Sequence, residues 1–177
     1  MSDSGPLAPA GDAGALKQAY SCFPSGVVAV CRRDGDGRPI GMSASAFTTV
    51  SLDPPLVSVC VREESATWPQ LRDAPALGVS VFAADQAELC RRLAGPPAGR
   101  FDGVETIDEA DGALFLADAT AHLLCTRYAE YPAGDHSVVL LRIEALRSDP
   151  EAEPLVFHAS SFRALEARRA AAGPQDE

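Results

Sequence analysis

A run of small residues is the first feature of this sequence that could take part in chemistry. Residues 41–47, GMSASAF, alternate Met42 and Ala44 on one face of a predicted β-strand with Ser43 and Ser45 on the other. Small side chains let a flat ligand approach the backbone, whose N–H and C=O groups can then bind its polar edge. The alternative is that these residues only allow a tight contact within the sheet.

A second candidate is a site for an anion at the start of a predicted helix. Ser65 and Thr67 offer hydroxyl groups where free N–H groups meet the positive end of the helix dipole. Arg100, which precedes Phe101 in a Gly-rich segment, could balance a bound negative charge. Most helix starts bind nothing, and a single surface arginine is usually only solvated, so both alternatives stay open.

Metal-dependent and nucleophilic chemistry lack comparable signals. The three histidines, His122, His136 and His158, stand far apart, and no cysteine or carboxylate is spaced to make a metal site predictable. The five cysteines contain no CxxC pair and are odd in number, which indicates reduced and mostly buried thiols. The chain also lacks a P-loop and the HExxH, GxSxG and GxGxxG motifs.

Composition limits the class of protein. A chain of 177 residues with 46% hydrophobic and 23% charged residues is expected to form one folded domain. The net charge of -10, with no basic stripe, argues against nucleic acid as a partner. Apolar runs are too short to cross a bilayer and no secretory signal is recognisable, so we expect a cytoplasmic protein with no membrane partner. We expect the domain over residues 13–165, with flexible ends at 1–12 and 166–177.

Periodicity and turn residues predict the elements that would position these candidates. The predicted helices cover residues 13–22, capped by Asp12, residues 67–73, capped by Thr67, and residues 85–94, with Asp85 and Glu88 as a capping box. The predicted strands cover residues 26–31, 38–47, 56–61, 76–82, 119–131 and 136–148, with turns at 34–37 and 132–135. Residues 95–112 are expected to be irregular. Hairpin strands with a few short helices favour an antiparallel barrel.

The order of the sequence segments resembles that of a known family. FPSGVVAV, GMSASAFTTVSLDPPLVSVCV, SATWPQLR, FAADQAELCRRLAG, GRFDG and GDHSVVLLRI follow one another between residues 23 and 143. This order is similar to that of the flavin reductase-like, FMN-binding split-barrel family. The resemblance implies a mainly β fold with short helices, in which an antiparallel split β-barrel of the Greek-key type forms the domain.

The resemblance also implies which residues bind the cofactor. Contacts with the flavin ring would come from Met42, Ser43, Ala44, Ser45 and Ala46, with Ser58 and Cys60 on the neighbouring strand. Contacts with the flavin phosphate would come from Ser65 and Thr67, with Arg100 and Phe101 nearby. Phe157, His158 and Phe162 could cover the site from the same chain or from a partner chain.

The family resemblance gives His136 a catalytic role. It matches the histidine that positions the nicotinamide of NADH or NADPH for hydride transfer to N5 of FMN or FAD. The alternative is a hairpin residue that only exchanges a hydrogen bond with Asp135.

The resemblance implies a homodimeric flavin reductase that binds flavin and nicotinamide nucleotides. It also implies a separate flavin-dependent monooxygenase as the partner that receives the reduced flavin. Three alternatives remain: an electron carrier without reductase activity, a flavin-dependent oxidase of a small organic substrate, and a barrel that no longer binds flavin.

Overall fold

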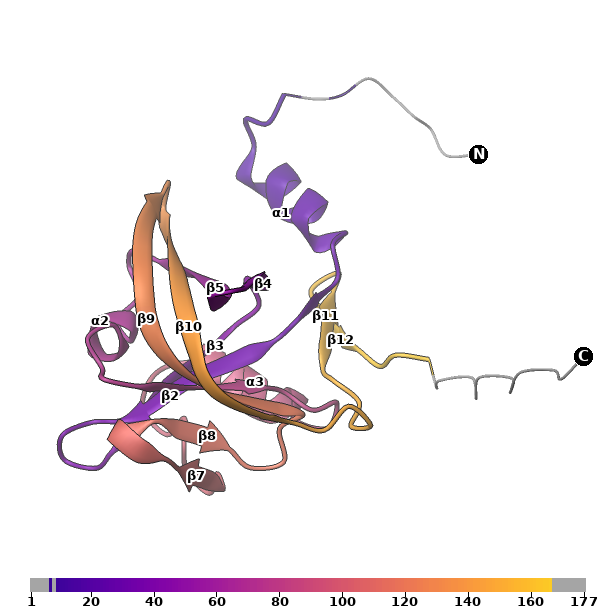
Figure 1. Cartoon of the computed structure of the whole chain (residues 1–177). Helices are drawn as coiled ribbons and strands as arrows, with labels where there is room; N and C mark the ends of the chain where they lie inside the picture. Colours follow the sequence, from indigo (N-terminus) through magenta and orange to yellow (C-terminus); the bar gives the residue numbers. More distant parts are fainter. Residues whose placement is uncertain (1–6, 8, 167–177) are drawn as a thin grey trace, which may run out of the picture.

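A seven-stranded antiparallel sheet forms the centre of the protein (Figure 1). The structure is a computed structural model that describes residue 7 and residues 9–166. The strands follow the order β3-β2-β6-β9-β10-β5-β4. Their bounds are β2 Val28–Arg33, β3 Pro39–Ala44, β4 Phe47–Leu52, β5 Pro55–Arg62, β6 Leu77–Val81, β9 Ala121–Ala133 and β10 His136–Ser148. The predicted fold class, mainly β and antiparallel with short helices, is therefore confirmed.

Smaller elements surround this sheet. Two further sheets pair β1 with β11 and β12, and β7 with β8. The strand bounds are β1 Ser25–Gly26, β7 Thr106–Asp108, β8 Leu114–Leu116, β11 Val156–His158 and β12 Ser161–Arg163, and the helix bounds are α1 Ala13–Ser21, α2 Trp68–Leu71, α3 Ala87–Ala94 and the 3-10 helix η1 Ala110–Gly112. In the part of the chain that the structure describes, no helix is long and apolar enough to cross a membrane. Of the ends predicted to be flexible, residues 1–6, 8 and 167–177 lie outside the described residues.

The sheet has two free ends, β3 and β4, so hydrogen bonds do not close it into a continuous barrel. The sequence predicts one strand over residues 38–47, and this prediction is wrong, because the chain changes partners in the middle. β3 pairs with β2 as far as Ala44, and β4 pairs with β5 from Phe47 onward. Ser45 and Ala46 lie between the two ladders and are exposed. The Ala46 carbonyl accepts a hydrogen bond from the Cys60 N–H at 2.9 Å, which anchors the break to β5.

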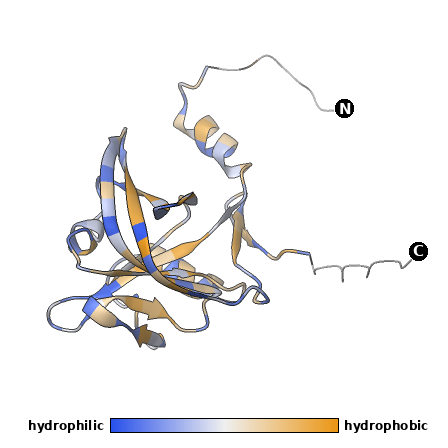
Figure 2. Ribbon diagram, in the orientation of Figure 1, coloured by the Kyte–Doolittle hydropathy of each residue, from blue (hydrophilic) through white to orange (hydrophobic). Residues whose placement is uncertain are grey.

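Strand β2 is buried on both faces, which explains its continuous apolar sequence. Val28 and Val30 belong to one buried cluster, with Trp68 and Leu71 of α2. Ala29 belongs to a second cluster on the opposite face, with residues of α3 and β8. Figure 2 shows hydrophobic colouring along much of β2 and hydrophilic colouring in the turn between β2 and β3.

The helix starts confirm one sequence prediction and contradict another. Asp12 caps α1, because its side chain accepts a hydrogen bond from the Ala15 N–H at 2.7 Å. The capping box of Asp85 and Glu88 is wrong, since α3 begins after Gln86 and has no side-chain cap. The Gln86 side chain instead accepts from the Ala83 N–H at 3.0 Å and donates to the Ala117 carbonyl at 2.7 Å. These two hydrogen bonds of Gln86 stabilise the turn before α3, so the helix begins at Ala87 and not directly after Asp85.

The late hairpin forms, but β9 begins and ends two residues later than the predicted strand 119–131, so its turn contains only Gly134 and Asp135. The segments on either side contain unpredicted strands. β9 and β10 pair along their whole length, and β10 has the predicted bounds. The segment 95–112 was expected to be irregular, but it contains β7 and η1. β8, β11 and β12 were not predicted.

Candidate cofactor-binding site

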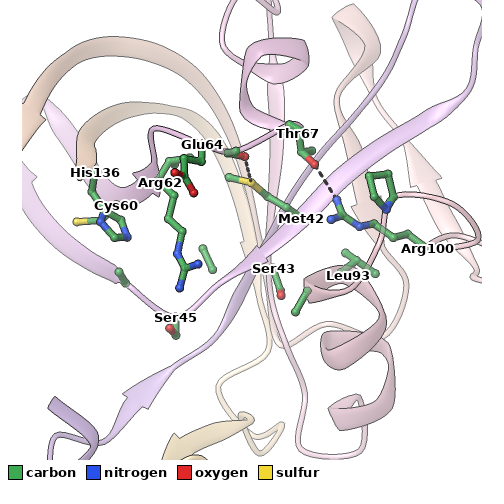
Figure 3. Close-up of a pocket in the computed structure, with 17 residues that line it drawn as sticks. Met42, Ser43, Ser45, Cys60, Arg62, Glu64, Thr67, Leu93, Arg100 and His136 are labelled. Atoms are coloured by element: carbon green, nitrogen blue, oxygen red, sulfur yellow. Dashed lines mark hydrogen bonds between the residues drawn. The ribbon is translucent and has the colours of Figure 1, made fainter. Parts of the chain in front are cut away.

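A cavity of about 590 Å³ lies where β3, β5, β10, α2 and α3 meet. Figure 3 shows its side chains converging from these elements. The lining residues are Met42, Ser43, Ala44, Ser45, Ala46, Cys60, Val61, Arg62, Glu64, Ser65, Ala66, Thr67, Leu93, Ala94, Pro97, Arg100 and His136. All of the binding and catalytic residues named from the sequence are therefore brought to one cavity, except Ser58 and Phe101.

Ser58 and Phe101 lie behind the cavity wall. Ser58 is buried within β5, between Leu140 of β10 and Thr48 of β4. Phe101 packs beneath β3, where a Cβ atom added to Gly41 would lie 2.9 Å from the Phe101 Cζ atom. Phe101 can therefore support the wall but does not line the cavity.

Arg100 ties three parts of the wall together. Its Nη1 donates to the Gly41 carbonyl at 2.6 Å and to the Thr67 hydroxyl at 2.9 Å. Its Nε and Nη2 donate to the Gly95 carbonyl at 3.1 and 2.6 Å. Burial lowers the pKa of the Arg100 guanidinium below its ordinary value, although an arginine remains charged. Its hydrogen bonds give it a structural role that sequence analysis did not identify.

The start of α2 differs from the prediction. Thr67 occupies the N-cap position, but its side chain makes no cap hydrogen bond. Ser65 caps the helix instead, because its hydroxyl accepts from the Trp68 N–H at 3.1 Å. The Thr67 hydroxyl is already the acceptor for Arg100. Since α2 contains only 4 residues, the predicted phosphate site must rest on these side chains and not on a helix dipole.

A buried carboxyl group fixes α2 against the sheet. Trp68 is 4% exposed, and its Nε1–H donates to Glu130 Oε1 of β9 at 3.1 Å. The second oxygen, Oε2, lies 3.4 Å from Arg72 Nη2 but has no hydrogen-bond partner among the described residues. Glu130 therefore positions the helix that carries Thr67 into the wall.

His136 lies at the end of the cavity formed by β10 and β5, near Cys60 (Figure 3). Its Nδ1 is 2.7 Å from Asp135 Oδ1. This hydrogen bond lowers the pKa of the Asp135 carboxyl group. Because Nδ1 is engaged, Nε2 is the ring nitrogen left to meet a ligand.

Buried thiols are poor candidates for chemistry at neutral pH. All five cysteines are free. Burial raises the pKa of Cys31 to about 12 and that of Cys90 to about 11. The described residues contain no group of three metal-ligating side chains.

Comparison with known proteins identifies the family. The family described as "Flavin reductase like domain" matches residues 20–166. The chain belongs to the flavin reductase-like family.

Relatives of this flavin reductase-like chain cover almost its whole length. The NADH-dependent flavin reductase of Rhodococcus sp is 39% identical over 85% of this chain and 85% of the relative. The reductase component of the 4-hydroxyphenylacetate 3-monooxygenase of Thermus thermophilus is 36% identical over 85% of this chain and 95% of the relative. The solved NADH:FAD oxidoreductase SgcE6 of Streptomyces globisporus, in complex with NAD and FAD fragments, has a TM-score of 0.83 and 32% identity, and covers 96% of this chain and 99% of its own.

The cavity of this flavin reductase-like chain fits a flavin on chemical grounds. Ser43 on the open edge of β3, and Ser45 just after the end of this strand, present small side chains and hydroxyl groups where the backbone is accessible to a planar ligand. Thr67 and Ser65 line the opposite region. The cavity therefore offers accessible backbone groups to the planar flavin ring, and side-chain hydroxyl groups to the polar substituents of the flavin.

Arg62 is a functional candidate that sequence analysis missed. It lines the cavity, and Figure 3 shows its side chain extending inward from β5. Its guanidinium makes no hydrogen bond or ion pair with another residue of the described ranges 7 and 9–166, in contrast to Arg100, although its charge helps to lower the pKa of the Asp135 carboxyl group. The period-two pattern of β5 offered a signal, because Arg62 continues the face of Ser58 and Cys60. Its free charge suits an anionic ligand in a protein of net charge -10.

Proposed function

We propose that this chain is an NADH- or NADPH-dependent flavin reductase that acts on FAD or FMN. The observation that carries the proposal is one cavity in which the open edge of β3, the free Arg62 guanidinium and His136 converge. The activities named for the Rhodococcus and Streptomyces relatives support it. When bound together, the two cofactors supply the hydride donor and the acceptor atom, flavin N5.

The break between β3 and β4 provides binding groups for the ring. Ser45 has no ladder partner, because pairing with β2 ends at Ala44 and pairing with β5 resumes at Phe47. Backbone N–H and C=O groups at such a position are available to the polar edge of a ligand. The side chains beside them are small, so a planar ring can approach this backbone.

His136 acts as a positioning group for the nicotinamide. Its Nδ1 is hydrogen-bonded to the Asp135 carboxyl group, so Nε2 is the ring nitrogen that can contact a ligand. A direct hydride transfer from the nicotinamide to flavin N5 does not require a side chain that acts as acid or base. The protein contributes by holding the two rings at reacting distance and by excluding water.

The setting of this activity is a homodimer in the cytoplasm that supplies reduced flavin to a separate flavin-dependent monooxygenase. The Thermus relative, named as the reductase component of a monooxygenase, supports the partner. Exposed apolar side chains on the edge strand β4, Val50 at 48% and Leu52 at 97%, support a surface that another copy covers. Five free thiols are consistent with a reducing compartment.

Steady-state oxidation of NADH and NADPH in air, with FMN or FAD varied, tests the proposal. We expect NADH oxidation that requires added flavin and saturates with it. Tight flavin binding without nicotinamide oxidation would instead indicate an electron carrier. Reduction of a bound flavin by a small organic substrate, with no response to NADH or NADPH, would indicate an oxidase.

A further inference from the structure

Two adjoining cavities lie between the β7–β8 hairpin and the base of the β9–β10 hairpin. Their volumes are about 290 and 310 Å³, and both are lined by Ile107, His122 and Arg147. Together they form one groove, called the base groove below. None of its lining residues also lines the cofactor cavity. In Figure 1 the β7–β8 hairpin lies at the bottom of the view and the tip of the β9–β10 hairpin, which carries His136, lies at the top. The base groove is therefore separate from the cofactor site.

Two neighbours on adjacent strands form the centre of the base groove. His122 of β9 pairs with Arg147 of β10, whose Nε and Nη2 both donate to His122 Nδ1, at 3.3 and 2.9 Å. His122 is 6% exposed, and its Nε2 donates to the Leu116 carbonyl at 2.7 Å. Among residues 7 and 9–166, no carboxylate forms an ion pair with Arg147, and its Nη1 has no hydrogen-bond partner. The centre of the groove therefore offers a cation, oriented by a buried ring, to a bound anion.

One side of the base groove is mainly apolar. Ile107, Phe115, Leu124 and Leu146 line the cavity on this side. The rings of Phe115 and His122 pack with their centroids 5.0 Å apart. Leu146 is 67% exposed, although its side chain is apolar. An apolar or aromatic group of a ligand would cover this surface and remove it from water.

The other side of the base groove is polar and acidic. Asp118 and Asp149 line the second cavity, together with Thr120 and Ser148. The apolar side contains one carboxylate, that of Glu109, which already accepts a hydrogen bond from the adjacent backbone N–H at 3.1 Å. The second cavity therefore suits a cationic group of a ligand, next to the arginine that suits an anionic one.

We propose that the base groove binds a free α-amino acid with an aromatic side chain. The α-carbon of such a molecule carries a carboxylate, an ammonium group and a side chain. These three groups match the Arg147 guanidinium, the carboxylates of Asp118 and Asp149, and the apolar side of the groove. An aromatic acid would leave the two carboxylates without a cation, and an aromatic amine would leave Arg147 without an anion. The proposal concerns a second ligand and does not rest on the proposed function.

Calorimetric titration of the full-length protein with L-phenylalanine tests the site. We expect the wild-type protein to bind L-phenylalanine with the same affinity with and without saturating FMN, since the groove and the cofactor cavity share no lining residue. 3-Phenylpropionate lacks the ammonium group, and 2-phenylethylamine lacks the carboxylate. Each should bind about tenfold more weakly than L-phenylalanine, because one charged contact is lost.

Two variants assign the binding to the base groove. Arg147→Gln should weaken L-phenylalanine binding about tenfold through loss of the cation. Asp118→Asn is the second variant, because Arg147 also contacts His122, and asparagine tolerates the φ of 56° found at position 118. It should weaken binding about threefold. The matched control is Arg142→Gln, since Arg142 is an exposed arginine of the same strand that lines neither cavity. Thermal melting of each variant checks that it folds.

The proposal is overturned if L-phenylalanine does not bind, or if either folded variant binds it as tightly as the wild type does. Displacement of L-phenylalanine by FMN would also overturn it, because the ligand would then occupy the cofactor cavity. Equal binding of 3-phenylpropionate would refute recognition of an amino acid. A protein that binds L-phenylalanine through Arg147 but oxidises no NADH or NADPH with any flavin would keep this site and refute the reductase activity.

Discussion

Arg100 Nη1 donates to the hydroxyl of Thr67 at 2.9 Å, which joins the loop after α3 to the start of α2 across 33 positions of sequence. The same nitrogen binds the Gly41 carbonyl of β3 at 2.6 Å. One buried side chain thus sets the relative positions of three segments that line the cavity. The wall is held by hydrogen bonds from this cation before any cofactor binds.

Arg100→Ala should destabilise the protein by about 3 kcal/mol, because the Gly41 and Gly95 carbonyls and the Thr67 hydroxyl lose their donor inside the wall. Urea unfolding followed by circular dichroism measures the change. Arg92→Ala is the control, since its hydrogen bond to the Asp102 carbonyl is exposed, and it should change stability by less than about 0.5 kcal/mol. Equal unfolding midpoints for the two variants would contradict the structural role of Arg100.

His136→Ala should lower kcat/KM for NADH about 100-fold, because the nicotinamide loses a group that positions it. Flavin binding should change by less than about twofold, since the backbone edge of β3 remains. Asp135→Asn should give a smaller loss, because it keeps a hydrogen-bond acceptor for Nδ1 but removes the charge. Stopped-flow reduction of bound flavin and fluorescence titration measure the two quantities. A parallel loss of flavin affinity would assign His136 to the flavin instead.

Arg62→Gln should weaken FMN binding about tenfold, since the cavity loses its unpaired cation. Binding by the wild-type protein should fall with rising salt more steeply than binding by the variant, because salt screens the charge. Flavin fluorescence titration at two ionic strengths provides the measurement. Arg38→Gln is the control, since Arg38 pairs with Asp34 and Asp36 in the turn between β2 and β3. If both variants bind FMN equally well, Arg62 does not contact the anion.

Local patterns predicted the hairpin of β9 and β10 and the helix start at Asp12. The alternation of apolar and polar residues, the turn residues and the capping residues all depend on positions that are close together in the sequence. The break at Ser45 is different, since it depends on which strands pair with β3 and β4. The hairpin of β11 and β12 also lacked a turn signal. Ala159 and Ser160 adopt φ values of 49° and 59°, a region that usually requires glycine or asparagine.

The same distinction applies to the candidate site. The family resemblance selected the residues along β3 and the start of α2, which line the cavity. It did not identify Arg62, whose importance depends on having no partner in the described structure. Likewise, the role of Glu130 beside Trp68 requires contact between segments 62 positions apart. Such tertiary contacts leave no local pattern in one sequence.

Gly78→Ala should destabilise the protein more than Gly41→Ala. An added Cβ at Gly78 would overlap the backbone carbonyl oxygen of Leu114, so β8 would have to move away from β6. At Gly41 the closest atom is the Cys31 Sγ at 2.5 Å, a side-chain atom that can shift. We expect a loss of about 3 kcal/mol or more for Gly78→Ala and about 1 to 2 kcal/mol for Gly41→Ala.

The control for these two variants is Gly35→Ala in the turn between β2 and β3, where an added Cβ meets nothing within 4 Å. It should change stability by less than about 0.5 kcal/mol. Chemical denaturation of all three variants gives the order. A Gly78→Ala protein as stable as Gly35→Ala would show that β8 does not pack on β6 in solution.

His122 should make the protein less stable as the pH falls below about 6.5, the ordinary pKa of histidine. The pKa of His122 is lowered, mainly by burial and also by the charge of Arg147. The hydrogen bond between His122 and the Leu116 carbonyl acts in the opposite direction but does not outweigh these effects. The Nε2 lies 2.7 Å from the Leu116 carbonyl, so it carries the proton of the neutral ring. The Nδ1 then accepts from Arg147 Nη2 at 2.9 Å. Protonation of Nδ1 would place two donors against each other.

The unfolded chain binds this proton at a higher pH than the folded protein does, so stability rises with pH between the lowered pKa and about 6.5. The melting temperature should therefore fall between pH 7 and pH 5. His122→Gln should flatten this dependence, because its amide can donate to Leu116 and accept from Arg147 without titrating. Asp34 and Asp108 do not contribute in this range, since hydrogen bonds to Arg38 and Arg33 lower the pKa of each carboxyl group below its ordinary acidic value. Scanning calorimetry of the wild-type protein and His122→Gln between pH 7 and pH 5 measures this dependence. If the melting temperatures of the two proteins fall equally with pH, another group controls the stability in acid.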